Sequence, residues 1–166
     1  AEQSAKWFKE NLREKMIDFD TMTAAGSCET SQAMAIYYGL FEPNEIPKAV
    51  ERLVEIIHSS GDTIDTGILG FRIIFHTLTE YGHSELAYRM IVGPQSPCFG
   101  DWVRQGETTM REQVICDKDG ICSHNHHFWG DISSWFMRNL AGIRINDPGT
   151  DVHHVDLRPQ FISALS

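Results

Sequence analysis

The sequence predicts an all-α fold built from antiparallel α-hairpins, with a short β tail at the C-terminus. Three observations lead to this prediction. Apolar residues recur at helical spacing over most of the first 92 residues and again in "WGDISSWFMRNLAGI". The segments between these stretches are short, so consecutive helices are expected to be antiparallel neighbours. Near the end of the chain the pattern changes to alternation, which is typical of strands.

The first predicted helix covers residues 5–19 and is amphipathic. Its apolar side chains Trp7, Phe8, Leu12 and Met16 are spaced to share one face. We therefore expect this face to pack on the helices that follow.

The remaining helices are marked by the same spacing and by glycines at their ends. Gly61 is the expected end of the third helix. After the first helix, the predicted helices cover residues 33–40, 45–61, 68–82, 83–91 and 129–143.

Two regions depart from this helical pattern. Residues 95–125 are predominantly polar and interrupted by glycines, and a long irregular stretch in a compact domain is usually functional. Residues 143–161 alternate and carry a turn at Pro148-Gly149, which predicts one or two strands.

Composition narrows the classes of protein and partner. The chain has 166 residues, 42% of them hydrophobic and 22% charged, which fits one globular domain. A net charge of −9 with scattered basic residues argues against nucleic acid as a partner. We find no apolar run long enough to span a membrane and no signal-peptide pattern at the start, so no membrane partner is predicted and the compartment stays open.

Four cysteines are too few for a disulfide scaffold in a domain of this size. Two of them, Cys116 and Cys122, flank a predicted hairpin with Asp119-Gly120 as its turn. The sequence leaves open whether they form a bridge.

A zinc site is one hypothesis for this region, because Cys116, Cys122, His124 and His126 are all zinc-ligand types. Their spacing matches no standard structural zinc motif. The competing interpretation is that the histidines pack against the next helix or cap it. We therefore predict neither a metal site nor a cofactor.

A carbohydrate site is the hypothesis that the composition favours. Sugars bind to aromatic faces through their C–H surfaces and to planar polar groups through their hydroxyls. The segments "CFGDWVRQGETTMREQ" and "SHNHHFWGD" supply both kinds of group. The aromatic members are Phe99, Trp102, Phe128 and Trp129, and the polar ones are Asp101, Arg104, Glu107, Thr108, Thr109, Arg111, Glu112, Asn125 and His126.

The order of several motifs resembles the C-terminal half of the catalytic domain of α-L-rhamnosidases, glycoside hydrolase family seventy-eight. The resemblance covers about residues 25 to 160. Earlier landmarks are "SCETSQAMAIYYGLF", "DTGILG" and "GHSELAYRMI". Later landmarks are Gly106-x-Thr108-Thr109-x-x-Glu112, Ser123-x-Asn125-His126, Gly130, Trp135 and Leu140-Ala141-Gly142-Ile143, followed by "VDLRPQF".

This resemblance implies a fold and a mechanism. Residues 1–145 would form part of an (α/α)6 toroid, and residues 146–166 would be exit strands toward a C-terminal β-domain. The family inverts the anomeric centre, which takes an acid and a base carboxyl about 6.5–9.5 Å apart. Glu112 would be the base, within the family's Gly-Ala-Thr-Thr-x-Trp-Glu motif.

The resemblance also implies a sugar-binding set. His126 falls on the family's substrate-binding histidine, with His124 as a close competitor. Thr108 and Thr109 would shape the turn that presents Glu112. We therefore expect a rhamnose-containing substrate to contact His126, Asn125, His124, Trp102, Trp129, Thr108 and Thr109.

The sequence departs from the family pattern at three positions. Arg111 replaces the tryptophan before the base, Glu107 replaces an alanine, and Phe99 stands where the family has a tryptophan. Two consequences of Glu107 stay open: it pairs with Arg111, or it raises the pKa of Glu112 by like charge.

The family's general acid has no counterpart in this sequence, and six helices are half of a twelve-helix toroid. From this we expect a fragment that does not hydrolyse rhamnosides alone and that self-associates through its open face. The alternatives are a non-catalytic carbohydrate-binding or scaffold module, and a related toroid glycosidase with another sugar specificity.

Overall fold

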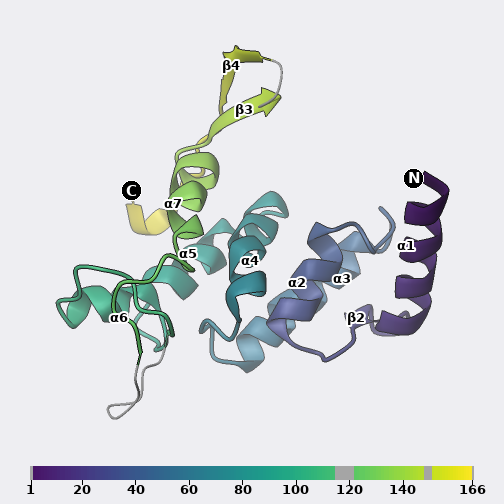
Figure 1. Cartoon of the computed structure of the whole chain (residues 1–166), viewed down its shortest axis with the longest axis horizontal. Helices are drawn as coiled ribbons and strands as arrows, with labels where there is room; N and C mark the ends of the chain where they lie inside the picture. The colour runs from purple at the N-terminus through teal and green to yellow at the C-terminus, as the bar shows by residue number, and fades with distance from the viewer. Residues whose placement is uncertain (1, 115–121, 148–150, 166) are drawn as a thin grey trace. The chain divides into compact units, whose positions relative to one another are not determined.

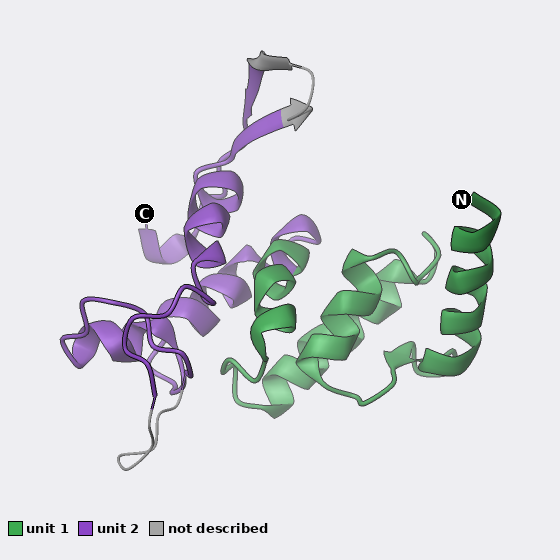
Figure 2. Cartoon of the chain, in the orientation of Figure 1, with its two compact units in different colours: residues 1–77 green, residues 78–166 purple. Residues whose placement is uncertain are grey.

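The computed structural model describes residues 2–114, 122–147 and 151–165 (Figure 1). The chain divides into two compact units, residues 1–77 and 78–166 (Figure 2). Unit 1 contains α1 (Glu2–Met16), β1 (Ile17–Asp18), β2 (Thr23–Ala24), α2 (Glu29–Tyr37), α3 (Ile46–Ser59) and most of α4 (Ile68–Glu80). Unit 2 contains the end of α4, α5 (Ser84–Val92), α6 (Phe99–Arg104), α7 (Asp131–Trp135), a π-helix (Phe136–Leu140), β3 (Ile143–Asp147), β4 (Asp151–Leu157) and a 3-10 turn (Ser163–Leu165).

The predicted fold class is confirmed: the described chain is mainly helical with a short β-hairpin near its end. Three details differ from the prediction. A short helix, α6, lies inside the stretch predicted to be irregular. The last predicted helix, residues 129–143, is instead α7 followed by a π-helix. A two-residue pairing, β1 with β2, was not predicted.

Helices α2 and α3 pack against each other in unit 1 and share a core of small and branched side chains. Gln32 of α2 is completely buried in this core. Its Oε1 accepts from the backbone N–H of Ala24 at 2.7 Å, and its Nε2 donates to the carbonyls of Met22 and Ala49, both at 2.9 Å. One side chain therefore joins α2, the β2 segment and α3. We call this set of three hydrogen bonds the Gln32 clamp.

Glu29, at the first turn of α2, is also buried. Ser60 donates its hydroxyl proton to Oε1 at 2.8 Å, and the backbone N–H of Asp65 donates to Oε2 at 3.2 Å. Burial raises the pKa of Glu29 to about 7, although both hydrogen bonds act in the opposite direction. This carboxyl group therefore titrates close to neutral pH.

Helix α4 approaches α2 closely at one point of unit 1. A Cβ atom added to Gly70 would lie 2.5 Å from Oγ1 and 3.0 Å from Cα of Thr30. The glycine therefore permits the contact between the two helices. Phe71 and Phe75, on the following turns of α4, are buried with their rings edge to face.

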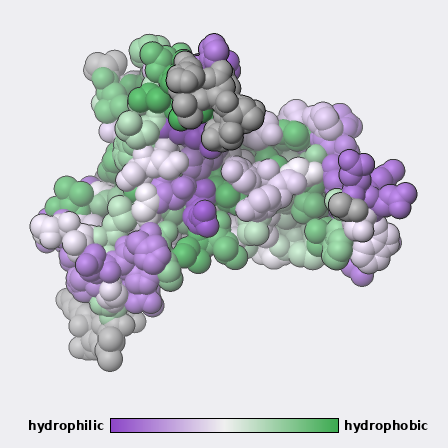
Figure 3. All heavy atoms as spheres, turned by 45° about the horizontal axis from the view of Figure 1, so that its top comes forward, coloured by the Kyte–Doolittle hydropathy of each residue, from purple (hydrophilic) through white to green (hydrophobic). Residues whose placement is uncertain are grey.

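The apolar face of α1 is not buried, contrary to the expectation from its spacing. Among the residues that lined this face, Trp7 is 58% and Phe8 60% exposed, and Leu12 and Met16 are exposed too. The helix is anchored instead by Arg13, which pairs with Glu45 through two hydrogen bonds of 2.8 and 2.9 Å. Figure 3 shows one face of the molecule, on which exposed hydrophobic residues lie between hydrophilic ones.

Unit 2 is organised around Trp135 of α7, which is almost fully buried. Its indole N–H donates to Oγ1 of Thr79 at 2.9 Å, which connects α7 to the end of α4. Directly after Trp135 the helix widens, and the N–H of Ala141 donates to the carbonyl of Phe136 at 2.8 Å, five residues earlier.

The chain then turns sharply into the hairpin β3–β4, which is antiparallel with Ile143 opposite Leu157. Gly142 has φ +70, and an added Cβ atom would lie 2.0 Å from the carbonyl carbon of Arg158. The N–H of Arg158 donates to the carbonyl of Gly142 at 2.9 Å. Glycine is therefore needed on both counts, conformation and space. The predicted turn at Pro148-Gly149 lies outside the described residues.

Candidate functional site

The predicted site lies in unit 2, on two stretches that we call the site segment: residues 105–114 and 122–129. The first stretch follows α6, and Gly106, with φ +78, reverses the chain at its start. The second stretch leads into α7. The intervening residues lie outside the described part, and with them the predicted turn at Asp119-Gly120 and one partner of the Cys116–Cys122 question.

Backbone hydrogen bonds hold the two stretches antiparallel. The N–H of Glu112 donates to the carbonyl of Ser123, and the N–H of His126 donates to the carbonyl of Met110, both at 2.8 Å. The hydroxyl of Thr109 donates to the carbonyl of His124. The sequence, read as a loop with a hairpin inside it, did not reveal the partners Met110 and Ser123.

Glu112 is half-buried, and its carboxylate is oriented by the opposite stretch. The backbone N–H of Ser123 donates to Oε2 at 3.3 Å, which complements the bond from the N–H of Glu112 to the carbonyl of Ser123. Oε1 has no hydrogen-bond partner among the described residues. One carboxylate oxygen is thus fixed, and the other is free to accept a proton from water or a hydroxyl group.

His126 is half-buried on the second stretch, opposite the one that carries Glu112. Its ring contacts Phe128 edge to face, with centroids 3.6 Å apart. The backbone N–H of Phe128 lies 3.3 Å from Nδ1, which places the acceptor lone pair there. In the neutral ring the proton is then assigned to Nε2, which can donate to a ligand hydroxyl. Asn125 is exposed, and its backbone N–H donates to Oγ of Ser123 at 3.3 Å.

Glu107 resolves an alternative that the sequence left open, because it forms the ion pair. Arg111 donates from Nε to Oε1 at 3.0 Å and also from Nη2, and Nδ1 of His124 lies 3.3 Å from Oε2. Hydrogen bonds from Arg111, followed by that from His124, hold the pKa of Glu107 below its usual value. The Glu107–His124 contact links the two stretches, and His124 remains 58% exposed.

The two tryptophans named as sugar contacts are buried rather than exposed. Trp102 is 4% and Trp129 5% exposed. Their indole N–H groups donate to backbone carbonyls, from Trp102 to Val114 at 3.3 Å and from Trp129 to Glu112 at 3.0 Å. Their rings therefore pack beneath the site segment and do not present an open face to a ligand. Phe99 packs edge to face on Trp102.

Thr108 and Thr109 are both exposed, and of the two Thr109 has the bond that joins the stretches. Among the described residues, no group of three or more histidine, cysteine or acidic side chains is placed to hold a metal ion, and Cys116 lies outside them. No helix in the described part of the chain is long and apolar enough to cross a membrane.

Comparison with known proteins shows the family to which the chain belongs. Residues 2–140 match the model of the bacterial α-L-rhamnosidase six-hairpin glycosidase domain. The chain belongs to this rhamnosidase family. The predicted resemblance and the predicted fold class, part of an α/α toroid, are therefore confirmed.

Individual rhamnosidases agree with this assignment. An α-L-rhamnosidase of Streptomyces avermitilis is 32% identical over 126 residues, which cover 71% of this chain and 12% of that protein. One from Alteromonas sp. (strain LOR) is 25% identical over 172 residues, covering 99% of this chain and 18% of that protein. The chain therefore spans less than a fifth of the length of these relatives.

Solved rhamnosidase structures contain the same fold. The Streptomyces avermitilis α-L-rhamnosidase complexed with L-rhamnose matches with a TM-score of 0.83 at 25% identity, over 92% of this chain and 15% of that one. The α-L-rhamnosidase from Dictyoglumus thermophilum matches with a TM-score of 0.80 at 30% identity, over 89% of this chain and 17% of that one.

Proposed function

We propose that the site segment carries the water-activating side of an inverting glycosidase site that acts on terminal α-L-rhamnosides, with Glu112 as the general base. The observation that carries this proposal is the pair of hydrogen bonds between Glu112 and Ser123. It fixes one carboxylate oxygen and leaves Oε1 free of partners among the described residues. Oε1 takes a proton from water as the water oxygen attacks the anomeric carbon.

His126 and Asn125 hold the sugar beside this base. The Nε2 proton of His126 is available to a ring hydroxyl, and the exposed amide of Asn125 can pair with a neighbouring one. His124 adds a third polar group, oriented by Glu107. Trp102 and Trp129 position the base through the backbone and do not stack on the sugar.

The proton donor for the leaving oxygen is a different carboxyl group. Glu107 is the other carboxyl group of the site segment, but Arg111 and His124 hold it ionised with a lowered pKa, so it has no proton to give. Because the family's general acid also has no counterpart in this sequence, we place it outside this chain. The expected consequence is that the purified chain does not hydrolyse rhamnosides.

Ligand-observed NMR of L-rhamnose against the chain tests the sugar site, with L-fucose and mannose as controls. We expect selective binding of rhamnose that is lost in His126→Ala and kept in Glu112→Gln, because the base acts on water rather than on sugar affinity. Equal signals from all three sugars, or a mutant that binds as well as the parent, would contradict the site assignment.

Hydrolysis of p-nitrophenyl α-L-rhamnopyranoside tests the base. In a longer protein that carries this chain, Glu112→Gln should lower kcat by about 10²–10⁴-fold with little change in KM. Gln113→Glu, which adds a carboxylate next to the base, should not restore the rate in that variant. Turnover by the chain alone, abolished by Glu112→Gln, would overturn the placement of the acid outside it.

The open face of α1 supports a second, structural proposal: the chain self-associates. An apolar groove of about 600 Å³ lies beside α1 and α2 in unit 1, with Phe8, Leu12 and Met34 among its lining residues. Exposed apolar surface of this kind favours association with a second copy. Sedimentation velocity should show dimers that Phe8→Glu dissociates, and a monomer at all concentrations would contradict the proposal.

A further inference from the structure

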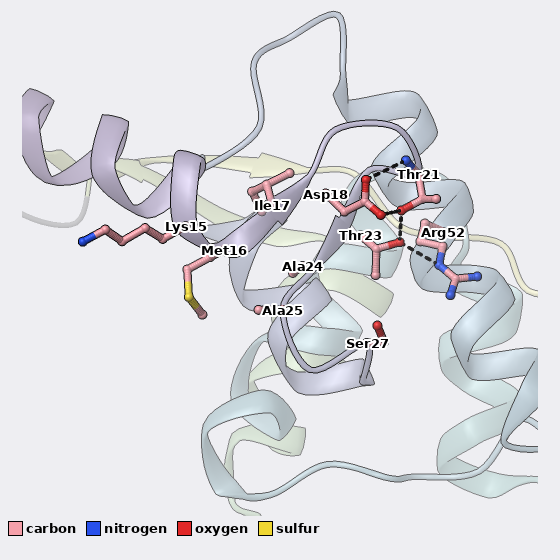
Figure 4. A pocket seen from close by; sticks show the side chains of 10 residues that line it. All are labelled: Lys15, Met16, Ile17, Asp18, Thr21, Thr23, Ala24, Ala25, Ser27 and Arg52. Carbon is pink, nitrogen blue, oxygen red and sulfur yellow. Dashed lines mark hydrogen bonds between the residues drawn. The ribbon is translucent and has the colours of Figure 1, made fainter.

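Unit 1 contains a second pocket that shares no residue with the site segment (Figure 4). It is open, has a volume of about 530 Å³, and lies between the end of α1, the β1–β2 turn and α3. This volume is within the range of about 300–1,000 Å³ that small-molecule sites occupy. Its polar lining consists of Lys15, Asp18, Thr21, Thr23, Ser27 and Arg52.

A chain of hydrogen bonds orients four of these side chains (Figure 4). Nε of Arg52 donates to Oγ1 of Thr23 at 3.0 Å, the hydroxyl oxygens of Thr23 and Thr21 are 2.8 Å apart, and Thr21 donates to Oδ2 of Asp18 at 2.9 Å. The Thr21 hydroxyl is within donating distance of both Asp18 and Thr23, so its single proton serves one of these two acceptors at a time. The two hydroxyls therefore connect the Arg52 guanidinium to the Asp18 carboxylate.

Both oxygens of the Asp18 carboxylate accept hydrogen bonds from within the β1–β2 turn. Besides the bond from Thr21, the carboxylate accepts from the backbone N–H of Asp20 at 2.9 Å. The hydrogen bond from the Thr21 hydroxyl, followed by that from Asp20, lowers the pKa of Asp18. The negative charge in the pocket is thus held by the protein's own donors.

Arg52 and Lys15 both have N–H donors that make no hydrogen bond or ion pair within the described ranges. Nη1 of Arg52 pairs with Glu55 at 2.8 Å, while Nη2 has no partner within the described ranges. The exposed ammonium group of Lys15 also has no ion-pair partner there. The hydroxyl of Ser27 has no hydrogen-bond partner in the same part of the chain. The capacity left at the pocket is on the donor side, which fits a ligand rich in acceptors.

The backbone around the pocket adopts an unfavourable conformation. Met22 and Ser27, on either side of β2, have φ values of +54 and +46. The left-handed region costs a residue with a side chain about 1–2 kcal/mol. Residues with a strained backbone are often found at ligand sites. Ser27 is one of the residues that line this pocket.

We propose that this pocket binds a hydroxylated carboxylate of the uronic-acid class. The carboxylate pairs with Arg52 Nη2, and the sugar hydroxyls accept from or donate to Ser27 and Thr21. Lys15, whose side chain points away from Arg52 in Figure 4, adds a positive charge at the other side of the pocket. Ala24 and Ala25 add small apolar groups to the lining. The site is independent of Glu112 and His126.

A ¹H–¹⁵N titration of the chain with D-glucuronate tests this, with D-glucose and acetate as separate ligands. We expect saturable shifts for the amides of residues 15–27 and Arg52, none with D-glucose, and binding of acetate at least tenfold weaker because it lacks the hydroxyls. Acetate binding as tight as glucuronate would overturn the sugar-acid assignment. No saturable shift with glucuronate would overturn the site.

Two variants separate binding from folding. Lys15→Gln lies on the exposed end of α1 and should weaken glucuronate binding by about threefold, because this charge attracts the ligand without contacting the carboxylate. Arg52→Gln should weaken it further. Lys6→Gln, which removes an exposed charge from α1 away from the pocket, is the matched control, and an equal effect of this variant would overturn the proposal. Rhamnose binding at the site segment should be unchanged in all three.

Discussion

Glu29 of unit 1 and Glu107 of unit 2 place the same chemical group in opposite surroundings. Glu29 is buried, receives one hydroxyl and one backbone N–H, and has a pKa raised to about 7. Glu107 is partly exposed, receives a guanidinium and an imidazole, and has a lowered pKa. Among the described residues, no cation donates to the Glu29 carboxylate, whereas Glu107 has a full ion pair with Arg111.

This difference extends to the regions around them. The α2 region is held by buried hydrogen bonds, and the Gln32 clamp leaves no donor or acceptor of that side chain to a ligand. The site segment is held by half-exposed polar contacts. They leave Oε1 of Glu112 without a hydrogen-bond partner among the described residues and the His124 side chain 58% exposed. The buried polar groups of the α2 region are therefore occupied by bonds within the fold, whereas those of the site segment keep unused hydrogen-bonding capacity.

The largest expected effect comes from breaking the clamp. Gln32→Met keeps the volume of the side chain but leaves the N–H of Ala24 and the carbonyl of Met22 without these hydrogen bonds, at about 1–3 kcal/mol each, whereas the carbonyl of Ala49 keeps its intrahelical bond in α3. We expect a loss of about 4 kcal/mol in the free energy of unfolding, measured by urea denaturation. Gln3→Met on exposed α1 is the control, and a clamp variant as stable as this control would show that the clamp contributes little.

The next effect is the pH dependence that Glu29 imposes. Its folded-state pKa of about 7 exceeds the ordinary 4.5, so the folded protein holds this proton more tightly than the unfolded chain. The stabilisation is complete below pH 4.5 and is lost as pH rises through 7, by about 3 kcal/mol in all.

Glu29→Gln removes this dependence, so the stability difference between parent and variant should change by about 3 kcal/mol between pH 4.5 and pH 8. Urea denaturation at both values measures it, with Glu14→Gln on α1 as the control. The same difference at both pH values would mean that Glu29 titrates as an exposed group does.

The smallest effect on stability, and the sharpest on the site, is expected for Glu107→Ala. A partly exposed ion pair contributes little to folding, so the urea midpoint should barely move. The Nδ1 proton of His124 loses its acceptor, and its ring should shift toward the tautomer protonated at Nε2. ¹⁵N spectra of the imidazoles report this, and Glu10→Ala on α1 should leave them unchanged. An unaltered His124 tautomer would contradict the Glu107–His124 link.

Helical periodicity predicted the helices of both units because most of their apolar residues face the core. It failed for the environment of α1, since spacing reveals that a face exists but not that a partner covers it. It also missed α6, because six residues give less than two turns of pattern. Helical spacing also could not reveal the π-helix, because the hydrogen bonds of α- and π-turns differ by only one residue in their span.

The sequence named the residues of the candidate site but not how they are arranged. Motif resemblance singled out Glu112 and His126, which the fold brings onto two paired stretches. The roles of Trp102 and Trp129 depend on burial, which composition does not encode. Ser123 was quoted in a motif but not named as a site residue, because its contact with Glu112 is made by its backbone N–H, which residue type does not reveal.

Two glycines in unit 2 look alike in sequence and impose different limits on evolutionary drift. Gly142 and Gly106 both have positive φ, but an added Cβ atom meets the backbone of Arg158 at Gly142 and open space at Gly106. At Gly106, asparagine and aspartate are tolerable replacements, since both enter the left-handed region readily. At Gly142 any side chain displaces the strand that follows. During evolution, substitutions are therefore tolerated more readily at Gly106, at the start of the site segment, than at Gly142, between the π-helix and β3.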